Sequence, residues 1–70
     1  MADILQLATL TIPLGQQDIQ VQQIQHVEGG MPLLRLRIRE GKRFTIFDMD
    51  AQSAKTLGAV MQQWAQDQGY

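Results

Sequence analysis

Three short breaks that contain glycine divide the first two thirds of this chain into four pieces, each with the composition of a β-strand. Pro13-Leu14-Gly15 ends the first piece, Glu28-Gly29-Gly30 the second and Glu40-Gly41 the third. Connections this short join neighbouring antiparallel strands, because a parallel crossover needs about a dozen residues or more. The sequence therefore predicts an antiparallel meander of four strands.

The last part of the chain changes from an alternating pattern to a helical one. After Asp50, apolar residues recur every three or four positions and fall on one side of a helix: Ala54, Leu57, Val60, Met61 and Trp64. Asp50 is a suitable N-cap and Gly69 a suitable stop. The predicted fold class is α+β, a four-stranded antiparallel β-meander followed by one C-terminal amphipathic helix packed on one sheet face, in a single domain of residues 1–70.

The third strand alternates three arginines with three aliphatic residues, which is typical of a strand with one buried and one wet face. Its pairing with the fourth strand depends on the loop, since a slip of one residue inverts a whole strand. A two-residue loop of Glu40-Gly41 would mix the two faces. We expect the three-residue loop Glu40-Gly41-Lys42 instead, which pairs Arg39 with Arg43, Arg37 with Thr45 and Arg35 with Phe47.

That register predicts two distinct surfaces. The first is a core under the helix, made of Leu36, Ile38, Phe44, Ile46, Leu57, Met61 and Trp64. The second is a basic face on the opposite side of the sheet, whose candidate binding residues are Arg35, Arg37, Arg39, Arg43 and Phe47. Guanidinium groups around an aromatic ring are what sheet surfaces use to hold single-stranded nucleic acid. The alternative is a solvated face on which the arginines pair with acidic neighbours such as Glu28, Glu40 and Asp48.

No residue pattern indicates a catalytic, cofactor or metal site. Asp48 and Asp50 lie at the strand-to-helix junction, where carboxylates cap helices. His26 has no serine or cysteine nucleophile in reach, and Ser53, the only serine, reads as part of the helix cap. We therefore expect a protein that is not an enzyme and that has no cofactor and no metal.

The size of the chain points to a second copy as a partner. Seventy residues make a marginal core, and the absence of cysteine excludes disulfides and thiolate metal sites. Ala54 and Gly58 put small residues on one helix stripe, which suits packing on the sheet or a helix pair across a two-fold axis. No window approaches the roughly 20 apolar residues of a membrane span, and the first residues do not resemble a signal peptide. We expect a cytoplasmic homodimer without a membrane partner.

The layout resembles that of the positive-cofactor-four-like transcriptional coactivators. The resemblance rests on four antiparallel strands, the basic hairpin Gly41-Lys42-Arg43 and the run from Phe44 to Asp50 that leads into an amphipathic helix. It covers the whole chain in topology and positions 41 to 64 in residue pattern, and it implies dimers that bind single-stranded DNA on their sheets. This chain lacks that family's basic flank and its additional exposed aromatic residues. The sequence also resembles a small uncharacterised bacterial protein family, which implies no function.

Two functions follow from the sequence as expectations. The first is a small non-enzymatic binding module, a homodimeric accessory protein that interacts with a protein partner of unknown identity. The second is a single-stranded nucleic-acid-binding protein that uses the basic sheet face. A net charge of -1 favours the first, because nucleic-acid-binding domains are usually basic.

Overall fold

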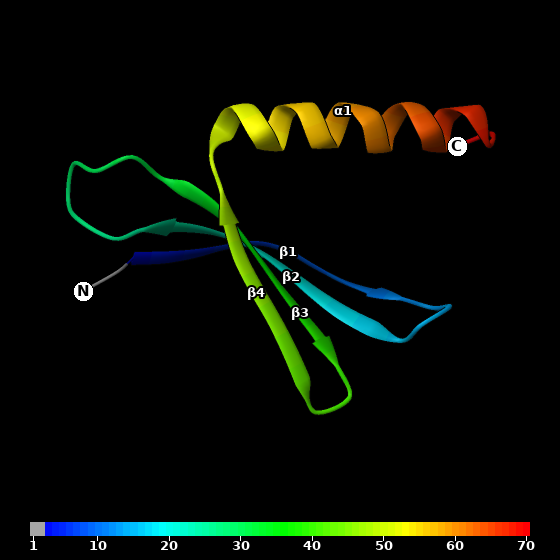
Figure 1. Ribbon diagram of the computed structural model, residues 1–70, viewed down its shortest axis with the longest axis horizontal. Helices are drawn as coiled ribbons and strands as arrows, with labels where there is room; N and C mark the ends of the chain where they lie inside the picture. Colours follow the sequence, from blue (N-terminus) through cyan, green and yellow to red (C-terminus); the bar gives the residue numbers. More distant parts are fainter. Residues whose placement is uncertain (1–2) are drawn as a thin grey trace.

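The computed structural model describes residues 3–70 and confirms the predicted order of elements (Figure 1). The strands are β1 (Asp3–Ile12), β2 (Gln17–Gln25), β3 (Leu33–Glu40) and β4 (Arg43–Met49), and the helix is α1 (Ala51–Asp67). The strands form one open antiparallel sheet in the order β1-β2-β3-β4, so β1 and β4 are its edges. The fold class is α+β, as the sequence predicts.

The strand pairing gives the sheet two chemically different faces, because opposed residues share a face and neighbours along a strand alternate. The apolar face carries Leu5, Ala8, Leu10, Ile12, Ile19, Val21, Leu34, Leu36, Ile38, Phe47 and Met49. The arginine face carries Arg35, Arg37 and Arg39 together with Gln6, Thr9, Thr11, Asp18, Gln20, Gln22, Phe44, Ile46 and Asp48, and at one end of the sheet the aliphatic residues Ile4, Ile24 and Leu33.

A β-bulge in β1 keeps its leucines on the apolar face. The register between β1 and β2 shifts between Gln6 and Ala8, so Leu7 is an extra residue without a partner on β2. Leu5 and Leu10 lie an odd number of residues apart and would point to opposite faces of a regular strand. The extra residue compensates for this, and both side chains join the apolar face.

The β3–β4 hairpin corrects the predicted register. Glu40 pairs with Arg43, so the loop is the two-residue Gly41-Lys42 rather than Glu40-Gly41-Lys42. Gly41 has φ +60, and a glycine with positive φ at the first position of a two-residue loop is typical of a type II′ turn. This turn matches the twist of the flanking strands, and it moves every residue of β4 to the face opposite the predicted one.

Both predicted helix ends are confirmed. The Asp50 carboxylate accepts a hydrogen bond from the Ser53 backbone N–H at 3.2 Å, which is the N-cap interaction. At the other end Gly69 has φ +98, and the Tyr70 N–H donates to the Ala65 carbonyl at 3.1 Å. With the Gly69 N–H donating to the Gln66 carbonyl at 3.0 Å, these contacts form a Schellman motif. The helix limits are therefore set by local sequence.

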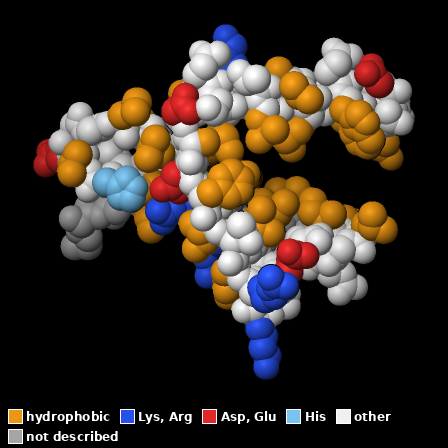
Figure 2. Space-filling model, viewed as in Figure 1, with side chains coloured by type: hydrophobic (Ala, Val, Ile, Leu, Met, Phe, Trp, Pro, Cys, Tyr) orange, Lys and Arg blue, Asp and Glu red, His pale blue; other side chains and the backbone are white. Residues whose placement is uncertain are grey.

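The sequence predicts that the helix packs along one face of the sheet, but in the structure it does not. It approaches the sheet at β3 and then runs above it, separated by an open space that Figures 1 and 2 show clearly. The predicted core cluster is therefore wrong for the single chain: Phe44 and Ile46 lie on the arginine face, while Leu57, Met61 and Trp64 are exposed. Among residues 3–70, only Ile24 is fully buried.

Candidate functional site

The arginine face brings together three of the five predicted binding residues. Arg35, Arg37 and Arg39 lie in a row on β3, on the side of the sheet that faces away from the helix. Arg43 and Phe47 do not join them, because the observed register places both on the other side. Their prediction as members of this surface is wrong.

Phe44 takes the place that the sequence analysis gave to Phe47. The Arg37 guanidinium lies over the Phe44 ring, with its carbon 4.3 Å from the ring centroid, and Arg37 Nη1 donates to the Gln20 side chain at 3.1 Å. The signal that could have identified Phe44 is the turn, since glycine at position 41 suits the first place of a two-residue loop.

Two aspartates hold the remaining arginines. Arg35 makes a bidentate contact with Asp48, with Nε donating at 2.7 Å and Nη2 at 3.1 Å. Arg39 pairs with Asp18, whose carboxylate also accepts from the Thr11 hydroxyl at 2.8 Å. The hydrogen bonds from Thr11 and then Arg39 lower the pKa of Asp18, and the hydrogen bond from Arg35 lowers that of Asp48. All three arginines therefore already have partners within the sheet.

The carboxylates of Asp48 and Asp50, at the junction between β4 and α1, make contacts that stabilise the fold. Asp48 binds Arg35, and the His26 ring lies 3.7 Å from the same carboxylate. Asp50 caps the helix, and the hydrogen bond from the Ser53 hydroxyl is the main cause of its lowered pKa. Within residues 3–70, no three His, Asp or Glu side chains gather closely enough to hold a metal ion.

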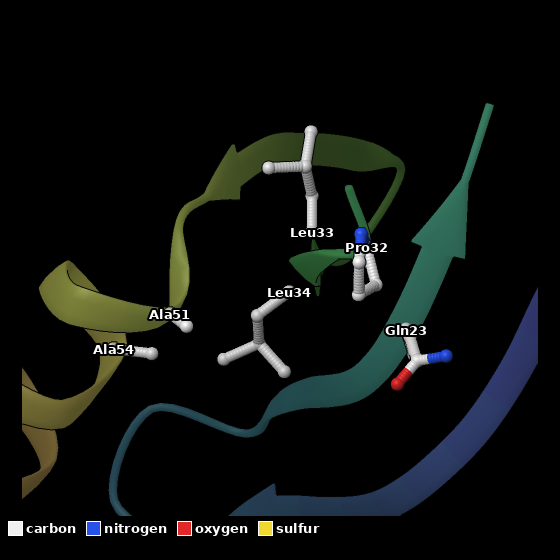
Figure 3. A pocket seen from close by; sticks show the side chains of 6 residues that line it. All are labelled: Gln23, Pro32, Leu33, Leu34, Ala51 and Ala54. Carbon is white, nitrogen blue, oxygen red and sulfur yellow. The ribbon is translucent and has the colours of Figure 1, made fainter. Parts of the chain in front are cut away.

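The second candidate surface is the groove between the helix and the apolar face. Its inner end is an open cavity of about 260 Å³ lined by Gln23, Pro32, Leu33, Leu34, Ala51 and Ala54 (Figure 3). Leu34 belongs to the apolar face and points toward Ala51 and Ala54 in Figure 3. The apolar stripe of α1 that contains Ala54 is therefore directed toward the apolar face of the sheet.

Both walls of the groove are apolar and exposed. We call Ala54, Leu57, Val60, Met61 and Trp64 the helix stripe. Its Leu57 is 44% exposed, Met61 60% and Trp64 66%, and across the groove Leu10 is 45% and Phe47 43% exposed. Figure 2 shows hydrophobic side chains on both sides of the open space. A monomeric protein rarely leaves so much continuous apolar surface in water, so this groove is the strongest candidate for an interface.

The charged residues of the apolar side lie at the ends of the strands. Asp3 stands at one end of the sheet, and Glu40 and Arg43 form an opposed pair at another. The middle of the apolar face is free of charge in the described part of the chain. Its chemistry suits an apolar partner surface rather than an anionic ligand.

Comparison with known proteins gives a family but no activity. No helix in residues 3–70 is long and apolar enough to cross a membrane. No curated protein and no solved structure matches the chain. The resemblance to positive-cofactor-four-like coactivators is not shown by any match, and the dimers and DNA binding that it implies stay predictions. The expected likeness to a family without an assigned function does fit: the chain belongs to the family of unknown function DUF6967, which matches residues 1–67.

Proposed function

We propose that this protein is a non-enzymatic binding module that works as a homodimer. The observation that carries the proposal is the groove, whose two apolar walls face each other without touching along most of the helix. Domains are stable when at least two layers of secondary structure bury a shared core. A single chain in this conformation buries little, and a second copy can supply the missing layer.

The exposed surface area supports an interface of the extent found in obligate homodimers. The chain exposes 5764 Å², whereas a compact monomer of 7.9 kDa exposes about 4,400 Å². The excess of about 1,350 Å² lies within the roughly 1,000–2,500 Å² that each partner buries in an obligate homodimer. The radius of gyration agrees, at 13.8 Å against about 11 Å for a compact chain of 70 residues.

In such a dimer the arginine face points away from the two-fold interface. Its arginines are held by Asp18, Asp48 and Gln20, so they form an ordered surface with little net charge. Exposed Phe44 and Ile46 add apolar area between the charged pairs. This mixture suits a protein partner and is the reason for proposing an accessory, protein-interaction role.

Single-stranded nucleic acid is the second candidate ligand, and one observation favours it. The Phe44 ring is about half exposed beside Arg37, which places a stacking ring next to a cation. Against it, three arginines face two aspartates on this surface, and a phosphate would have to displace contacts already made. We therefore rank it below the protein-interaction role.

Two measurements test these proposals. Sedimentation equilibrium over nanomolar to micromolar concentrations should give a mass of two chains, and a single-chain mass with cooperative unfolding would refute the homodimer. Titration with labelled single-stranded DNA at low and moderate salt should show no binding. If binding is seen, Arg37→Ala should lower the slope of log affinity against log salt by about 0.7, and the second candidate would replace the first.

A further inference from the structure

The chain does not close the groove with its own side chains. The helix stripe approaches the sheet at Ala54, beside Leu34, and is open at Met61 and Trp64. The helix of 17 residues is about 25 Å long, and beyond Ala54 its stripe runs above the sheet across the open space. A further apolar layer is needed to contact both walls.

The width of the sheet leaves room for two helices. Four strands about 4.8 Å apart cover roughly 19 Å, and a helix with its side chains is about 10 Å across. One helix packed on the apolar face would therefore cover about half of it, and the chain's own helix approaches that face only at β3. The other half, which includes Leu5 and Leu10 on the edge strand β1, needs a second helix or an equivalent layer.

Gly58 adds an independent indication of a close neighbour. It lies within the helix, where glycine is unfavourable compared with alanine, so its presence needs a packing reason. Within the described chain, a Cβ on Gly58 would meet nothing within 4 Å outside its own helical turns. The packing reason is therefore absent from the single chain and fits a second chain that approaches the helix backbone there.

We propose that the groove receives helix α1 of a second copy, so that each helix packs on the partner's apolar face. The inference rests on the proposed homodimer and specifies how it is built. A two-fold axis makes the exchange reciprocal, and the two helices then lie together between two sheets. The excess area of about 1,350 Å² per chain matches an interface of this extent.

A paramagnetic label on one chain, read out on the other, tests the exchange. The protein has no cysteine, so Gln62→Cys, on the polar side of the helix, gives one labelling position for a nitroxide. The labelled chain carries no NMR isotope and is mixed with an unlabelled chain that has ¹³C methyl groups. Because only the second chain is detected, every effect of the nitroxide is intermolecular.

The expected result is line broadening of the Val21 and Leu36 methyl signals, which belong to the apolar face. Ile46, on the arginine face of the same sheet, should broaden less and serves as an internal reference. The matched control is the same mixed sample after chemical reduction of the nitroxide, which should restore all signals.

The outcomes separate this inference from the homodimer itself. A two-chain mass without broadening at Val21 and Leu36 would overturn the helix exchange and leave the homodimer intact. Broadening of methyl groups along the outer edge of β1 alone would also overturn it, in favour of pairing between edge strands. A one-chain mass would overturn the homodimer.

Discussion

Trp64→Ala measures how much of the dimer depends on closing the groove. Trp64 is 66% exposed in the single chain, so closing the groove over it removes up to about 165 Å² from water, taking roughly 250 Å² for a tryptophan. At about 25 cal/mol per Å² this is about 4 kcal/mol per chain. A two-fold dimer buries the residue twice, and 1.4 kcal/mol changes an equilibrium constant tenfold. Losing even half of this burial free energy, summed over both chains, should raise the dissociation constant of the dimer more than about a hundredfold.

Sedimentation equilibrium of the wild type and of Trp64→Ala gives the two dissociation constants directly. Trp64→Phe is the matched control, because it keeps a ring on the helix stripe and should lose much less. Trp64 is the only tryptophan, so its emission in the wild type should move to longer wavelength when dilution separates the chains. An unchanged dissociation constant, with unfolding free energy within about 0.5 kcal/mol of the wild type, would show that Trp64 stays in water and that the groove argument is wrong.

Four other perturbations have defined outcomes. Gly58→Ala should favour the isolated helix by about 0.5–1 kcal/mol and yet raise the dimer dissociation constant, and a dimer strengthened by it in sedimentation would contradict a close approach at Gly58. Gly41→Ala forces a side chain into φ +60 and should cost about 1–2 kcal/mol in chemical denaturation, whereas Lys42→Ala should cost almost nothing. Asp50→Ala removes the N-cap and should cost about 1 kcal/mol, seen as lost helical circular dichroism. The pKa values of Asp18 and Asp50 are lowered below 3.8 on folding. Their contribution to stability is therefore complete above about pH 5 and is lost as the pH falls through the lowered pKa values. Asp18→Asn should make this loss of stability shallower in acid denaturation.

The local elements could be predicted because each depends on a few neighbouring residues. Strand limits follow from the glycine-containing breaks, and the helix limits follow from Asp50 and Gly69. The grouping of Arg35, Arg37 and Arg39 on one face follows from their alternation alone and needs no register.

The predicted register of the last hairpin is wrong because the two-residue turn at Gly41-Lys42, and not the segregation of apolar residues, determines the pairing. Separating the faces favoured Phe44 and Ile46 under the helix. The positive φ of Gly41 and the opposed charges of Glu40 and Arg43 favour the observed pairing, and Arg37 partly covers the exposed Phe44 ring. The bulge at Leu7 is absent from the prediction, although the odd spacing of Leu5 and Leu10 is a sequence signal for it.

The helix position was beyond prediction from one chain's sequence for a different reason. An amphipathic helix has the same pattern whether its stripe packs on its own sheet or on another. The sequence predicts Leu57, Met61 and Trp64 in a core with the sheet because one amphipathic helix can cover the apolar face of the third and fourth strands. In the structure these three side chains are exposed in the groove. Sequence periodicity does not indicate whether the same chain or another chain packs against them.

The bulge at Leu7 also affects the tendency of this protein to aggregate in solution. β1 is an edge strand with no charged residue after Asp3, so its outer backbone groups could template the addition of further strands and lead to aggregation. The extra residue twists the strand and interrupts the regular ladder that such growth requires. Deleting Leu7 would straighten the edge and leave Leu5 on the apolar face, because Leu5 and Leu10 would then lie an even number of residues apart in a regular strand. Fibre formation followed by thioflavin fluorescence should become faster in that variant.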